Sequence, residues 1–164
     1  MKKISKLLFI IIFGLSCADK EKKEYTPLER AQIRKISDSF ISSAEKRLAT
    51  DTTGLKDSPV KVLSCKFITR EYSTYKDIQM SYKNVSNKTI TAVKFEWYGE
   101  NAFGEPADMG FQNGRGGGFD DKTLKPGRTS SGTWSILSRD GKKIINAHAY
   151  KVVFQDGNIW ELKQ

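Results

Sequence analysis

Cysteine and histidine are scarce in this sequence, whose 164 residues include two cysteines and one histidine. A zinc site needs several such side chains at short, regular spacing, and the sequence has no such set. His148 has no second histidine and no clear carboxylate at ligand spacing, and no serine stands in a nucleophile motif. We therefore expect no enzyme, no metal and no small-molecule cofactor. An unrecognised enzyme would need a cleft that brings His148 together with two carboxylates.

Long apolar runs are lacking as well. The longest, Leu7 to Leu15, is interrupted only by Gly14, and it is shorter than the ~20 residues that a bilayer-spanning helix needs. It follows the basic start Met1 to Lys6 and leads to a small residue, Ser16. This order of basic, apolar and small residues is typical of a secretory signal and argues against a transmembrane anchor.

The signal ends in Phe13-Gly14-Leu15-Ser16-Cys17, which resembles the lipobox of bacterial lipoproteins. The resemblance implies that residues 1–16 are removed as a signal peptide and that Cys17 carries a thioether-linked diacylglycerol, usually with a third chain on its amine. Such a protein resides in the cell envelope, and several acyl chains anchor it durably at about 0.8 kcal/mol per buried methylene. The alternative is a plain secretory signal, which leaves Cys17 free to pair with Cys65.

A charged tether and a helix are expected next. Residues 17–25 are dense in Lys, Glu and Asp, as in solvated linkers. Thr26-Pro27-Leu28-Glu29 fits a capping box, which predicts a helix over residues 26–50. Its apolar residues recur at spacings of three and four: Ile33, Ile36, Phe40, Ile41, Ala44 and Leu48. We expect this amphipathic helix to pack on its own domain; binding to a partner or to a membrane surface is the alternative.

From Val60 onward the apolar period changes to two, which predicts strands in a domain spanning residues 58–164. The alternating sets are Leu63, Cys65 and Phe67; Ile78, Met80 and Tyr82; Val93, Phe95 and Trp97; and His148, Tyr150, Val152 and Phe154. Turn residues separate them, and Asp156-Gly157 between two strand-like runs is a strong hairpin signal. Strands of this length and spacing favour an antiparallel sandwich, in which Cys65 and His148 are packed strand residues.

A family resemblance supports this fold class. The segment Lys83 to Ile90 is followed by Val93-Lys94-Phe95-Glu96-Trp97-Tyr98-Gly99 and then by Leu124-Lys125-Pro126-Gly127. The series resembles the FxLYD type of domain found in bacterial envelope proteins, over roughly residues 78–154. The resemblance implies a mainly β protein, an Ig-like antiparallel β-sandwich preceded by one amphipathic α-helix. It implies almost nothing about activity.

The stretch from Glu100 to Asp121 is long for a hairpin connection and includes a glycine-rich segment, residues 113–118. A phosphate-binding loop would need a following helix, so we expect this segment to be a flexible loop. The candidate partner-contact residues on this stretch are Phe103, Met109, Phe111 and Arg115, because aromatic and arginine side chains often anchor partners. The alternative is that the aromatic side chains fold back over the open end of the sandwich.

The expected function is therefore that of an anchored, non-enzymatic interaction or accessory module. Its partners would be the membrane, through the anchor, and another envelope protein. The alternative is a glycan or peptidoglycan binder, for which Trp134 and Trp160 would have to be exposed. The formal net charge of +9 is spread along a chain of alternating sign, so we expect no nucleic-acid partner.

Overall fold

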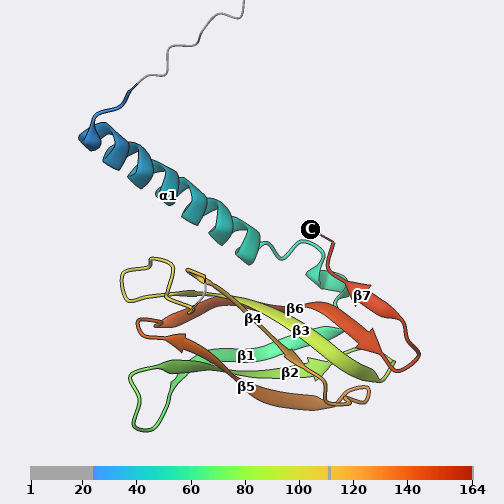
Figure 1. Ribbon diagram of the computed structural model, residues 1–164. Coiled ribbons are helices and arrows are strands. Elements are labelled where there is room, and N and C mark those ends of the chain that lie inside the picture. The colour runs from blue at the N-terminus through green and yellow to red at the C-terminus, as the bar shows by residue number, and fades with distance from the viewer. Residues whose placement is uncertain (1–23, 111, 164) are drawn as a thin grey trace, which may run out of the picture.

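A computed structural model describes residues 24–110 and 112–163 (Figure 1). The signal peptide, Cys17 and most of the tether lie outside the described residues. The mainly β fold with one preceding helix is confirmed. In chain order the elements are α1 (Pro27–Thr50), the short 3-10 helix η1 (Leu55–Asp57), β1 (Val60–Thr69), β2 (Lys76–Asn84), β3 (Ile90–Glu100), β4 (Arg115–Asp120), β5 (Thr129–Ser138), β6 (Lys143–Phe154) and β7 (Ile159–Glu161).

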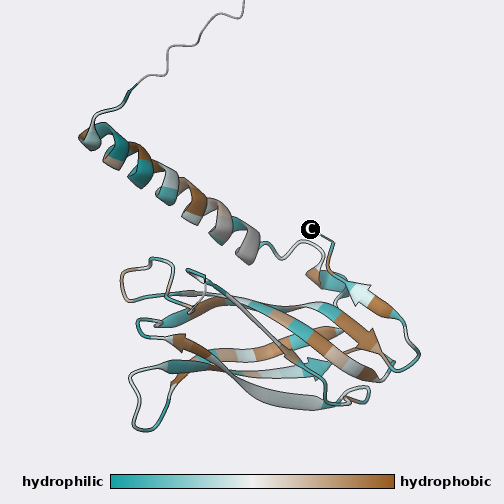
Figure 2. Cartoon of the chain, in the orientation of Figure 1, coloured by the Kyte–Doolittle hydropathy of each residue, from teal (hydrophilic) through white to brown (hydrophobic). Residues whose placement is uncertain are grey.

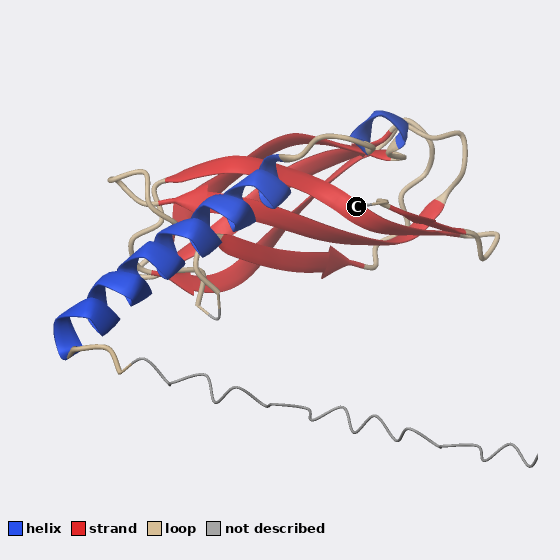
Figure 3. Ribbon diagram, turned by 90° about the horizontal axis from the view of Figure 1, so that it is seen from above, coloured by secondary structure: helices blue, strands red, loops and turns tan. Residues whose placement is uncertain are grey.

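The strands form two antiparallel sheets that face each other. One sheet has the order β1-β2-β5 and the other the order β4-β3-β6-β7. Hairpins join neighbours within a sheet, while the chain changes sheets after β2, β4 and β5, as in Ig-like sandwiches. In Figures 1 and 3 the C-terminal part of α1 lies over the outer face of the four-stranded sheet.

Aromatic rings fill the space between the sheets. The ring centroids of Tyr82 and Phe95 lie 4.6 Å apart, and Trp134 meets Phe95 edge-on at 5.7 Å. Trp97 packs beside Trp134 at 5.8 Å. The core cluster consists of Val60, Ile78, Met80, Tyr82, Ile90, Val93, Phe95, Trp97, Ala107, Met109, Leu124, Ile136, Ala149 and Val152. These side chains come from both sheets, so their burial holds the layers together.

Asn84 joins the turn after β2 to the opposite sheet. Its side chain is fully buried; its amide donates to the carbonyls of Lys88 at 2.8 Å and Leu124 at 2.9 Å. Its Oδ1 accepts from the backbone N–H and the hydroxyl of Ser86, and its carbonyl accepts from Gly127 N. The Asn84, Ser86 and Pro-Gly positions of the sequence motif are thus parts of one hydrogen-bonded junction.

Residues 115–118 of the glycine-rich segment belong to strand β4, so the prediction of a flexible loop was wrong for them. A Cβ on Gly116 would overlap the Trp97 indole, and one on Gly118 would lie 2.5 Å from Trp134 Cδ1. Glycine at both positions therefore lets β4 approach the buried indole of Trp97 and the partly buried indole of Trp134. Gly117 lies between them and points to solvent, so the alternation of a strand is present without side chains to reveal it.

Two bulges change the predicted strand faces. Leu63 was expected beside Cys65, but β1 slips one residue between Val62 and Ser64, and Leu63 is exposed. The register of β6 slips at Tyr150, so His148 does not share a face with Val152. A one-residue slip reverses the faces on either side of it. Cys65 does pack against the core, as expected.

The helix begins as the sequence predicts. Glu29 N donates to Thr26 Oγ1 at 3.2 Å, and Thr26 N donates to Glu29 Oε2 at 2.8 Å, which completes the capping box. The expectation that its apolar stripe packs on the domain was wrong for Ile33, Ile36 and Phe40, because Ile36 and Phe40 are 71% and 75% exposed. Ile41 of the same stripe does face the domain, across a groove. The sheet face beneath α1 presents polar side chains, such as Glu100, which accepts from Lys46 at 2.5 Å.

Candidate interaction surface

Three chain connections meet at one end of the sandwich: 70–75, 101–114 and 139–142. We call this region the loop end. Asp140 Oδ1 accepts from Asp108 N at 2.8 Å, and Lys142 N donates to Glu100 O at 2.8 Å. The Nζ of Lys76 donates to the carbonyl of Gly141. Arg139 donates to the hydroxyl of Tyr75 at 2.9 Å, so hydrogen bonds link all three connections at this end of the sandwich (Figure 1).

Two aromatic side chains project from the loop end. Phe103 is 87% exposed at the tip of the 101–114 connection. Asn101 holds this tip, because its Oδ1 accepts from Phe103 N at 2.9 Å and from Glu105 N at 3.1 Å. Tyr72 is 98% exposed on the 70–75 connection, with φ at +58°. A positive φ is strained for a residue with a Cβ, and such strain is common at functional sites.

The four residues that the sequence singled out are not gathered at one place. Phe103 is exposed at the loop end, whereas Met109 is only 4% exposed and belongs to the core. Phe111 lies outside the described residues. Arg115 stands at the start of β4, where its guanidinium pairs with Glu96 on the neighbouring strand. Because β4 begins there, the connection is shorter than the predicted span from Glu100 to Asp121.

Tyr72 was not singled out by the sequence argument. Its signal is an aromatic residue inside a polar connection, between Glu71 and Ser73. The hairpin of β1 and β2 places this connection at the same end of the sandwich as Phe103. Sequence alone does not show that two connections about thirty residues apart share one end, because this depends on the strand order.

A polar cluster lies on the outer face of the four-stranded sheet. His148 is directly opposite Glu96 in the β3–β6 register, and Arg115 pairs with the same carboxylate. Burial lowers the pKa of His148, and the Arg115 charge adds to this, while Glu96 opposes it. The residue is 6% exposed and lies opposite one carboxylate, that of Glu96. This is a packed strand histidine and does not match the cleft with two carboxylates that acid–base catalysis would need.

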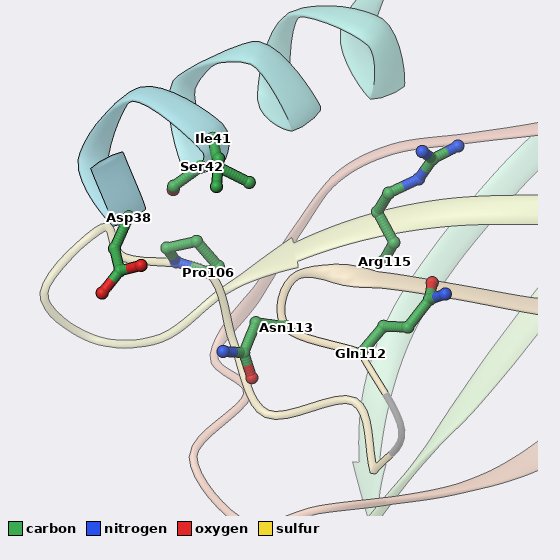
Figure 4. Close-up of a pocket in the computed structure, with 7 residues that line it drawn as sticks. All are labelled: Asp38, Ile41, Ser42, Pro106, Gln112, Asn113 and Arg115. Atoms are coloured by element: carbon green, nitrogen blue, oxygen red, sulfur yellow. The ribbon is translucent and has the colours of Figure 1, made fainter. Parts of the chain in front are cut away.

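A groove separates α1 from the loop end (Figure 4). Asp38, Ile41 and Ser42 line it from the helix, and Pro106 and Asn113 line it from the connection. Its volume is about 440 Å³, and its lining is mixed in polarity. The groove shows which face of α1 points toward the sandwich.

The tryptophans pack inward. Trp97 is fully buried, and Trp134 and Trp160 pack against the core while only partly buried. The indole N–H of Trp134 donates to the carbonyl of Phe119 at 3.0 Å. A sugar stacks on a free aromatic face, and these indoles are occupied by protein contacts. Exposed aromatic faces at the loop end belong to Tyr72 and Phe103 instead.

Two further features concern metals and membranes. Within residues 24–110 and 112–163, no group of three or more His, Cys, Asp or Glu side chains is arranged to hold a metal ion. Over the same residues, no helix combines the length and the apolar character that crossing a bilayer demands.

Burial raises the pKa of the Cys65 thiol to about 12, so this cysteine is a poor nucleophile and a poor ligand.

Comparison with known proteins gives a limited result. No family model matches the sequence, and no curated protein is similar to it. A hypothetical protein from Peptoclostridium difficile 630, solved by X-ray diffraction at 1.85 Å, aligns with a TM-score of 0.48 at 12% identity, over 64% of this chain and 87% of that one. An X-ray structure of a structural-genomics target aligns with a TM-score of 0.35 at 15% identity, over 65% and 84%. The lipobox and FxLYD resemblances stay predictions.

Proposed function

We propose that this protein is a lipoprotein of the bacterial cell envelope, anchored through Cys17, whose β-sandwich is a non-enzymatic interaction module. We further propose that the loop end is its contact surface for another envelope protein. The observation that carries this proposal is the pair of exposed aromatic side chains, Tyr72 and Phe103, on connections that hydrogen bonds hold in place.

The physical argument concerns the cost of that exposure. A phenylalanine left in water forgoes about 1.5–3 kcal/mol of burial free energy. The hydrogen bonds that Asn101 makes at the tip of the connection hold Phe103 in its exposed position. Aromatic anchors on a preorganised surface are the usual energetic centre of a protein interface. Charged residues lie on the same three connections: Glu71, Glu105, Asp108 and Arg139. An apolar centre with a polar rim is the common anatomy of such an interface.

The anchor is tested by the intact mass of the protein extracted from membranes. We expect a chain that begins at Cys17 and carries added acyl mass, and we expect Cys17→Ser to abolish both. An unacylated chain that is recovered in the soluble fraction would overturn the anchor. It would not affect the argument for the loop end, which rests on separate residues.

The contact surface is tested by site-specific photo-crosslinking in cells. A photoreactive residue at position 72 or 103 should give the same discrete adduct, because both positions belong to one surface. The matched control is Val85, which is half exposed on a turn at the opposite end of the sandwich. Equal adducts from position 85, or none from positions 72 and 103, would contradict the proposal.

A further inference from the structure

The apolar stripe of α1, made of Ile33, Ile36 and Phe40, points away from the β-sandwich. The residues that face the sandwich are Asp38, Ile41 and Ser42, which line the groove. At about 100° per residue, the stripe lies on the opposite side of the helix, and its side chains are exposed. In Figure 2 apolar segments recur along α1 between polar ones.

Basic residues lie on both sides of the stripe. With 3.6 residues per turn, Arg30 lies next to Ile33 on one side of the stripe. On the other side, Lys35 lines a shallow surface hollow together with Ile36 and Phe40. The acidic residue Asp38 is turned toward the sandwich, whereas Glu29 lies in line with the stripe at the start of the helix, where it is bonded to Thr26. An apolar centre between two basic borders complements a membrane surface, where acyl chains lie beneath anionic phosphates.

The chain length before the helix places α1 near a bilayer. Thr26, which caps the helix, is nine residues after Cys17. At about 3.3–3.6 Å per extended residue, the cap lies within about 30 Å of the anchored cysteine. A helix held so close to a lipid surface, with an unpartnered apolar face, has that surface within reach.

We propose that α1 lies in the headgroup region of an anionic membrane, with Ile33, Ile36 and Phe40 inserted and Arg30 and Lys35 at the phosphates. This proposal rests on the lipid anchor of the proposed function and adds a second membrane contact. It also sets the orientation of the protein, because the sandwich then lies on the side of α1 away from the bilayer. Figures 1 and 3 show that the N-terminal part of α1 extends beyond the sandwich, so the domain does not obstruct the approach.

A second copy of the helix is the weaker occupant. Three large apolar side chains on each copy bury far less than the roughly 1,000 Å² that a specific protein interface needs. The basic borders would also meet one another in a close pairing of identical helices, which is unfavourable for like charges. The small buried area and the repulsion between like charges both favour binding to lipid over self-association.

The experiment uses single labels on the acylated protein in vesicles of phosphatidylglycerol and phosphatidylcholine. An environment-sensitive dye is attached at Phe40→Cys, with Ser42→Cys as the matched control on the face toward the sandwich and Tyr72→Cys as a distant control. Acylation occupies the Cys17 sulfur, and burial keeps Cys65 from reacting. We expect a blue shift at position 40 alone, with strong quenching by nitroxide lipids whose spin label lies near the headgroups, because interfacial helices sit about 5–10 Å into the boundary.

Each outcome separates the helix from the anchor. An acylated protein whose label at position 40 is no more quenched than the one at Tyr72 overturns the proposal for α1 and leaves the anchor intact. A blue shift at position 40 without quenching by lipid means that protein covers the stripe, which also overturns it. If mass analysis shows no acyl chains but the label at position 40 is quenched, the helix binds the membrane by itself and the anchor proposal fails.

Discussion

Gly116 and Gly117 are neighbours in β4 with opposite environments, and the two alanine variants should therefore behave differently. A Cβ at Gly116 overlaps the buried Trp97 indole, while a Cβ at Gly117 lies 3.0 Å from the carbonyl oxygen of Phe95 and otherwise meets solvent. Overpacking of a core costs about 1–3 kcal/mol. Replacing glycine by alanine in a strand returns about 0.5–1 kcal/mol of backbone entropy.

We expect Gly116→Ala to lower the free energy of unfolding by about 2 kcal/mol, and Gly117→Ala to leave it within about 1 kcal/mol of the wild type. The measurement is urea unfolding followed by tryptophan fluorescence, which reports directly on Trp97 and Trp134. With a slope of about 2 kcal/mol per molar, the Gly116 variant should unfold at a urea concentration about 1 M lower. Equal midpoints for the two variants would refute the assignment of this segment as a strand packed on the indoles.

Three further predictions concern buried polar groups. Asn84→Ala removes four side-chain hydrogen bonds and should lower the free energy of unfolding, measured in urea, by at least about 2 kcal/mol. The control Val85→Ala should change it by no more than about 0.5 kcal/mol. Similar losses of stability in the two variants would contradict the hydrogen-bonded junction at Asn84. Burial lowers the pKa of His148, so the unfolded chain binds a proton more readily than the folded protein. The contribution of the neutral His148 to the free energy of unfolding is therefore complete above about pH 6.5 and declines as the pH falls. His148→Gln should flatten this decline, and parallel plots of stability against pH for the variant and the wild type would disprove it. Burial raises the pKa of the Cys65 thiol to about 12, which predicts that Cys65 of the folded protein is not alkylated at pH values near 8. Cys65 should be alkylated rapidly once the protein is unfolded in urea. Rapid alkylation of Cys65 in the folded protein would show that the thiol is accessible.

The residues of local elements carried enough information to predict those elements. Thr26 and Glu29 satisfy each other's backbone groups across one helical turn, so the capping box was readable without the rest of the chain. Alternation predicted the β-sandwich, because each inward position of a half-buried strand must be apolar. The turn that begins at Asn84 was predicted from its polar residues, although its bonds to the opposite sheet were not.

The tertiary structure decided what depends on a partner strand or layer. The bulges at Leu63 and Tyr150 shift the register of each strand by one residue relative to the neighbouring strand. Nothing in the alternating pattern of the sequence marks where that shift occurs. The candidate surface shows the same limit. Phe103 was predicted from its residue type, but Tyr72 joins it only because the strand order brings both connections to one end.

Two features show most clearly where the information lies. A glycine carries no side chain to alternate, so β4 could not be recognised from its own residues, and the indoles that require its glycines come from β3 and β5. The stripe on α1 has the helical period that the sequence determined, but a period does not say which surface covers it. The outer face of the sheet beneath α1 is polar, with Glu100 and the Glu96–Arg115 pair on it. The helix therefore turns Asp38, Ile41 and Ser42 to the domain and leaves Ile33, Ile36 and Phe40 exposed.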